Sequence, residues 1–209
     1  MSRGRKFGAL GAAAALVLLA GGCAAGTHPG AAATIGTTEI SVSDVDETAR
    51  AVSGALGQQF ETAVTLNELV NNALVQQVRD QRSVTVTDAE TAAAAKLVVR
   101  DATAFQKFEA DPVARDFLYR VAATAVATIK LGGGTGVTDP QAAQAQRAGV
   151  AVVKDAAKNI DVAIAPRFGQ WVDGAIKSDV SGSLSEESDQ AKAKRQAAEE
   201  AQRQQQPQG

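Results

Sequence analysis

The clearest helical pattern in the chain is Thr65-Leu-Asn-Glu-Leu-Val-Asn-Asn-Ala-Leu-Val-Gln-Gln77. Its apolar residues recur three and four positions apart, so they share one face of a helix. Thr65 and Glu68 have the spacing of a capping box, in which each side chain accepts a hydrogen bond from the backbone N–H of the other residue. The stretch therefore predicts a helix that begins at Thr65 and buries its apolar face in a helical core.

Signals for further helices lie on both sides of this stretch. Ser41 or Ser43 can cap the start of a helix. That helix is predicted to end near Gly57, because glycine readily adopts the left-handed conformation found at helix ends. Capping residues, together with Asp111-Pro112 at one helix start, predict more helices within residues 87–100, 103–110, 111–129 and 138–153. The chain is 45% hydrophobic but only 4% aromatic, which favours a lightly packed helical core.

Two short apolar stretches near the ends of the predicted helical region indicate strands. Ile35 and Ile40 flank Gly36-Thr37-Thr38, which predicts a strand, a turn and a second short strand. Residues 159–165 alternate isoleucine and valine with other residues, and residues 166–171 follow as a predicted turn. We expect the late strand to pair with the early one. The predicted fold class is mainly α, with a small two- or three-stranded sheet that joins the N- and C-terminal ends of the domain.

The first residues of the chain have the pattern of an export signal. Arg3, Arg5 and Lys6 are followed by an apolar run over residues 7–20, which suits a signal peptide better than a membrane span. Leu19-Ala-Gly-Gly-Cys23 then resembles a bacterial lipobox. The resemblance implies cleavage before Cys23, acylation of its thiol and a lipid anchor on the extracytoplasmic face of the cell membrane. An ordinary secretory signal is the alternative.

These patterns divide the chain into four parts. Residues 1–22 are the predicted signal peptide, 23–32 a tether, 33–180 the helical domain and 181–209 a polar tail that we expect to be disordered. The formal net charge is −2. Without an excess of basic residues, the composition argues against a nucleic-acid-binding protein.

Four segments resemble the SurA and PrsA family of extracytoplasmic chaperones. They are residues 34–46, residues 65–77, residues 84–90 and residues 161–171, and the similarity spans roughly residues 33–172. It implies a SurA-like N-terminal helical domain that binds unfolded or newly exported polypeptides. A cell-envelope lipoprotein that keeps this scaffold for a specific partner, without client binding, is the alternative.

Members of that family often carry an inserted parvulin prolyl-isomerase domain with active-site histidines. This chain has no segment long enough for it, and its only histidine, His28, lies in the predicted tether. A single histidine also argues against a Ser-His-Asp triad or a multi-histidine metal site. Cys23 is the only cysteine, and acylation would remove its thiol from catalysis. We therefore expect no enzymatic activity and no cofactor.

Two further patterns resemble ligand-binding sites, but a structural role is favoured for each. Gly132-Gly-Gly-Thr-Gly136 is rich in glycine, yet it lacks the lysine and hydroxyl residue of a phosphate-binding loop, so a loop or hinge is favoured. Asp44, Asp46 and Glu47 lack the further oxygen ligands of a calcium loop. Negative charge at a helix N-terminus explains them better.

Aromatic side chains are the candidates for a client-binding groove. Phe168 and Trp171 follow the late strand, and Phe117 and Tyr119 lie in a predicted helix. Packing in the core is the favoured role for each residue taken alone. The alternative is that together they line an apolar groove that holds unfolded segments.

Overall fold

The computed structural model describes residues 27–177. The predicted signal peptide, the first four residues of the tether including Cys23, and the polar tail lie outside the described residues. Within them the fold is mainly helical, as predicted. The helices are α1 (Val42–Leu56), α2 (Thr62–Gln81), α3 (Asp88–Val98), α4 (Ala102–Ala110), α5 (Pro112–Leu131) and α6 (Ala142–Ala156).

A small antiparallel sheet joins the two ends of the described domain, as the sequence predicts. Its strands are β1 (Ala31–Ile35), β2 (Thr38–Ser41) and β3 (Val162–Ile164), in the order β2-β1-β3. Ala33 of the central strand lies opposite Ile40 on one side and Ile164 on the other. β1 begins at Ala31, inside the predicted tether, because the central strand of the sheet is covered there and Ala32 and Ala33 are fully buried.

A second hairpin follows the sheet and was not predicted. Residues 166–171 form a short 3₁₀ turn, Pro166–Phe168, and then enter β4 (Gln170–Val172), which pairs with β5 (Ala175–Lys177). Asp173 and Gly174 connect the strands with φ values of 53° and 84°. Two consecutive positive φ values are typical of the tight hairpin turn that Asp-Gly favours, so the sequence did contain the signal for this hairpin.

Side-chain caps define most helix starts as expected. Ser41 and Asp44 form a capping box at α1, and Thr87 and Glu90 form one at α3. Asp111 accepts hydrogen bonds from two backbone N–H groups at the start of α5. The helices that begin at 42, 88 and 112 are therefore fixed by local sequence.

The predicted start of α2 is wrong by one helical turn. The helix begins at Thr62, and Glu61 at its N-cap makes no side-chain cap. Thr65 is fully buried inside the helix, where its hydroxyl donates to the Glu61 carbonyl at 3.0 Å. A threonine hydroxyl satisfied in this way can be buried within a helix, so no capping box forms with Glu68. The α6 helix likewise begins at Ala142, after the predicted cap at Thr138.

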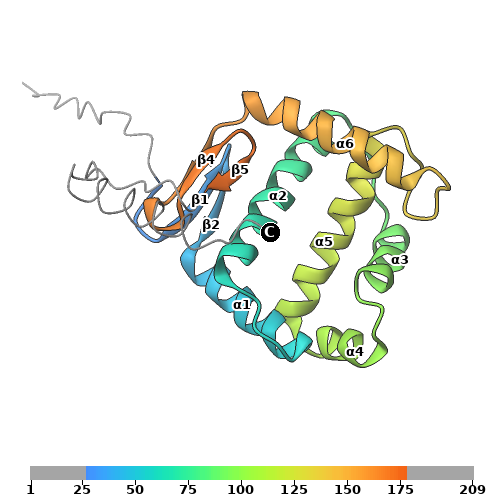
Figure 1. The fold of residues 1–209 in the computed structure, drawn as a ribbon, viewed down its shortest axis with the longest axis horizontal. Coiled ribbons are helices and arrows are strands. Elements are labelled where there is room, and N and C mark those ends of the chain that lie inside the picture. Colours follow the sequence, from blue (N-terminus) through green and yellow to red (C-terminus); the bar gives the residue numbers. More distant parts are fainter. Residues whose placement is uncertain (1–26, 178–209) are drawn as a thin grey trace, which may run out of the picture.

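Helix α5 lies at the centre of the helical layer and packs against α1, α2, α3, α4 and α6 (Figure 1). In the same view α6 crosses over one end of α2 and α5, and the strands gather at the opposite side from α3. One continuous apolar core includes residues from both the sheet and the helices, among them Ile35, Val45, Leu66, Leu118 and Val126.

Backbone contact between α5 and α6 depends on glycines. A Cβ atom added at Gly149 would lie 1.8 Å from the carbonyl oxygen of Thr128, and one added at Gly132 would lie 1.8 Å from that of Ala145. Real side-chain carbons cannot approach a backbone oxygen so closely. The glycine loop that begins at Gly132 therefore belongs to a close helix crossing.

Lys130 connects the C-terminal end of α5 to the start of α3. Its ammonium lies 2.6 Å from a carboxylate oxygen of Glu90 and donates to the Thr85 carbonyl at 2.8 Å. The hydrogen bond from Lys130, reinforced by the backbone N–H of Thr87, lowers the pKa of Glu90 from about 4.5 to about 2. Ionised Glu90 is thus favoured in the folded protein.

The contact predicts an acid-sensitive contribution to stability. Because the pKa of Glu90 is lower in the folded than in the unfolded chain, its contribution is present above pH 4.5 and is lost as the pH falls toward 2. We expect Glu90→Gln to lower the free energy of unfolding at pH 7 by about 1 kcal/mol or less, since both partners are partly exposed. The melting temperatures of variant and wild type should converge in acid. Asp88→Asn, in the same helical turn, is the control, and a difference independent of pH would contradict the assignment.

Candidate functional site

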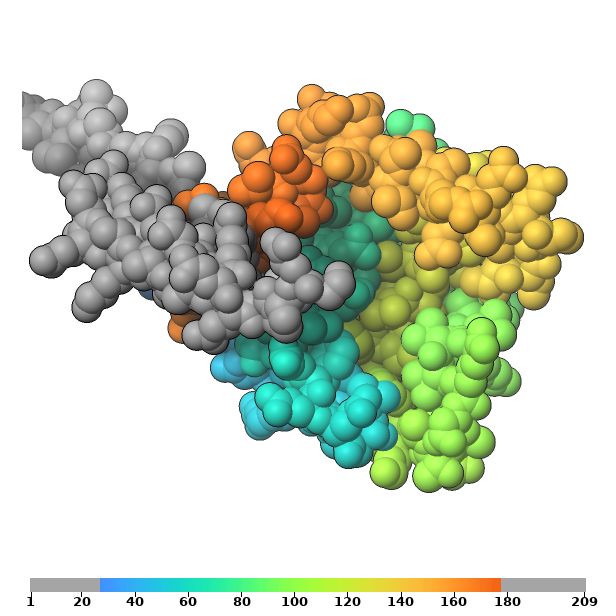
Figure 2. Space-filling model, in the orientation of Figure 1, coloured from blue at the N-terminus to red at the C-terminus, as the bar shows by residue number. Residues whose placement is uncertain are grey.

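An apolar hollow lies beneath α6 and is called the α6 cavity here. Its volume is about 390 Å³, and its walls come from α2, α5, α6 and the β4–β5 hairpin. Figure 2 shows the molecule hollowed in this region, with α2 and α5 visible at depth beside α6. Volumes of this size are typical of small-ligand pockets.

The lining of the α6 cavity combines apolar and amide side chains. Its apolar members are Leu74, Val75, Val121, Val150, Val153 and Trp171. Val150 is 54% exposed, so the cavity opens toward solvent at this side chain. Asn67 and Asn71, one turn apart on α2, and Gln146 on α6 add amide groups. Each amide can both donate and accept hydrogen bonds, as a peptide backbone does.

One carboxyl group and one ammonium group also line the α6 cavity. Glu68 lies on α2 and Lys154 on α6. Burial raises the pKa of Glu68, because its charged form loses hydration. No ion pair between Glu68 and Lys154 is formed within residues 27–177. The cavity therefore offers both signs of charge to a bound molecule.

Asn72 on α2 has an unusual environment. It is only 7% exposed, yet neither its amide nitrogen nor its amide oxygen has a hydrogen-bond partner among the described residues. A buried polar group without a partner costs about 1–3 kcal/mol, and such groups are uncommon in native proteins. Asn72 lines the α6 cavity and also a second cavity on the side of α1.

The four aromatic candidates do not form one groove. Trp171 lines the α6 cavity. Phe117 is 8% exposed, lines the second cavity and packs edge-to-face on Phe60, with ring centroids 5.8 Å apart. Trp171 and Phe117 therefore line two different cavities, and Phe117 also packs in the core.

Tyr119 and Phe168 line neither cavity. Tyr119 is half-buried on α5, where burial and then the nearby Glu109 raise its pKa. Phe168 is partly buried, and the Arg167 guanidinium lies 4.8 Å from the centroid of its ring. Packing against the core therefore explains why both side chains are partly buried.

Sequence reasoning missed Asn72, although the pattern contains a signal for it. Asn72 follows Leu69 by three positions and precedes Val75 by three, so it falls within the apolar face of α2. A polar residue in that position is either paired in the core or available to a ligand. Only the packing of α2 beside α5 decides between these outcomes.

The remaining candidates have structural roles in the described part of the chain. Asp44 accepts a hydrogen bond from the Ser41 backbone at 3.1 Å, as expected of a charge at a helix start. His28 is exposed just before β1. Among residues 27–177, no three acidic, histidine or cysteine side chains gather as metal ligands. None of the helices described is long and apolar enough to cross a membrane.

Comparison with known proteins gives no relatives: no family model matches the chain, and neither a curated protein nor a solved structure is significantly similar to it. The resemblance to the SurA and PrsA family therefore stays a prediction from the sequence segments. Among the described residues, the two cavities are the features that bear on function.

Proposed function

We propose that the protein is a lipid-anchored, extracytoplasmic lipoprotein with a non-catalytic, chaperone-like role. It binds unfolded or newly exported polypeptides. The observation that carries the proposal is the α6 cavity, whose apolar walls are interrupted by amide side chains. The anchor is inferred from the sequence around Cys23, which lies outside the described residues.

The lining of the α6 cavity suits a polypeptide without a fixed sequence. Leu74, Val75 and Val153 offer apolar contact that depends on area and not on direction. Asn67 and Asn71 can pair with the backbone N–H and C=O groups that every peptide carries. Together they allow weak binding of many sequences, which is what a chaperone-like role requires.

A test compares two aromatic neighbours in the suppression of aggregation. The full chain in lipid nanodiscs, at about a fivefold molar excess, should slow the aggregation of reduced insulin measured by light scattering. Trp171→Ala should weaken this effect about three- to tenfold, because an aromatic contact in the cavity is lost. Phe168→Ala is the matched control and should behave as the wild type, since Phe168 does not line the cavity.

Each outcome of this test has one meaning. No suppression by the wild type counts against the chaperone-like role and favours a lipoprotein with one specific partner. Suppression that is equally strong in both variants keeps the role but moves the binding site away from the α6 cavity.

A further inference from the structure

A second cavity lies on the side of α1 and is called the α1 cavity here. Its volume is about 430 Å³, and β2, α1, α2 and the first half of α5 form its walls. Ile40, Leu69, Ala73 and Phe117 provide apolar surface within it. This cavity is separate from the α6 cavity, and Asn72 is the one residue that lines both.

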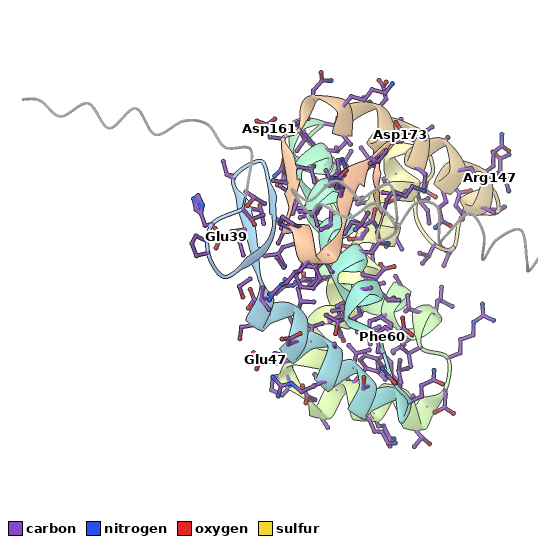
Figure 3. The ribbon with its side chains drawn as sticks, turned by 60° about the vertical axis from the view of Figure 1, so that its left-hand side comes forward. Glu39, Glu47, Phe60, Arg147, Asp161 and Asp173 are labelled. Atoms are coloured by element: carbon purple, nitrogen blue, oxygen red, sulfur yellow. The ribbon has the colours of Figure 1, made fainter. Side chains whose placement is uncertain are left out.

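Negative charge surrounds the α1 cavity. Its lining holds the carboxylates of Glu39, Asp44, Glu47 and Asp116 and one cation, Arg120. Arg120 already forms an ion pair with Asp116, and Asp44 belongs to the capping box of α1. Glu39 on β2 and Glu47 on α1 are exposed and lie on the same side of the molecule in Figure 3. Neither forms an ion pair within residues 27–177, so both can attract a cation from solution.

Asn72 supplies an independent indication of a ligand. It lines the α1 cavity, is 7% exposed and has no partner for either amide atom in the described chain. A peptide group presents one donor and one acceptor, so it could satisfy both atoms of the amide. The gain would be larger than for a surface hydrogen bond, because the buried amide is already desolvated.

We propose that the α1 cavity receives a lysine or arginine side chain from a bound, extended polypeptide. The aliphatic part of that side chain packs on Ile40 and Leu69, and its charged end lies near Glu39 and Glu47. The Asn72 amide pairs with the neighbouring peptide group. This inference rests on the proposed function and adds a preference for basic segments to it.

The experiment measures that preference with short fluorescent peptides and the full chain in nanodiscs. One peptide of about eight residues carries a central lysine between apolar residues, and its partner carries norleucine, which keeps the aliphatic stem without the charge. We expect the lysine peptide to bind about tenfold more tightly by fluorescence polarisation. The difference should shrink in high salt, because exposed carboxylates are screened.

Two variants locate the preference. Asn72→Leu should weaken binding of both peptides about tenfold while leaving the melting temperature unchanged or higher, because an unpaired buried amide is replaced by an apolar group. The double variant Glu39→Gln and Glu47→Gln changes only exposed residues. It should abolish the preference for lysine over norleucine while both peptides still bind.

The results separate this inference from the proposed function. Equal affinity of the wild type for the two peptides overturns the basic preference, as does a preference that survives the double glutamine variant. Unchanged binding by a folded Asn72→Leu protein overturns the role of the amide. In each case suppression of insulin aggregation would still support the chaperone-like role, whereas its absence would remove both proposals.

Discussion

Gly149→Ala is expected to lower the free energy of unfolding by about 3 kcal/mol, the upper part of the range for overpacked side chains. The added carbon would lie 1.8 Å from the Thr128 carbonyl oxygen and 3.1 Å from a methyl carbon of the same residue. Since the closest of these atoms is backbone, a rotamer change cannot relieve the clash, and α6 must move away from α5. Denaturation in urea, followed by circular dichroism, measures the change.

Gly54→Ala is the matched control. Gly54 is an exposed residue inside α1, and a Cβ atom there would meet nothing within 4 Å. This variant should gain about 0.5–1 kcal/mol, because alanine loses less conformational entropy than glycine in a helix. If both variants were equally stable, the close crossing of α5 and α6 would be wrong, and so would the shape of the α6 cavity.

Cys23→Ser should release the protein from the membrane. Two or more acyl chains hold a protein stably in a bilayer, whereas a chain without them has only weak contacts. A serine hydroxyl does not form the thioether that the lipobox resemblance implies. We expect metabolic labelling with a palmitate analogue to fall to background and the protein to leave the membrane fraction.

Ala25→Ser introduces the same side chain two positions away and should leave both labelling and fractionation as in the wild type. Persistent labelling of the Cys23→Ser protein would place the lipid elsewhere or show that the lipobox interpretation is wrong.

Local signals made much of the helical architecture predictable. Ser41, Thr87 and Asp111 mark helix starts because a cap is satisfied within four residues of sequence. The pairing of β1 with β3 was also predicted, from the turn between Ile35 and Ile40 at one end of the domain and the alternation of apolar residues at the other. The start of α2 was missed because burial of Thr65 depends on the core around it and not on its neighbours in sequence.

The cavities could not be predicted from the sequence, because they too depend on how separate elements pack together. Asn72 and Phe117 meet in the α1 cavity only because α2 and α5 pack side by side. Gly149 gives no sign in the sequence that it faces Thr128, since the contact joins two separate helices. Trp171 was proposed as a groove residue, but its neighbours in the α6 cavity come from elements spread over most of the domain.

The position of β1 has a consequence for the order in which the chain folds. β1 is the middle strand of its sheet, and one of its two partners, β3, follows about 130 residues later. While the chain is still being synthesised, one edge of β1 stays open and can pair with another strand. The sheet can therefore be completed only after all six described helices have been synthesised, because each of them precedes β3 in the chain.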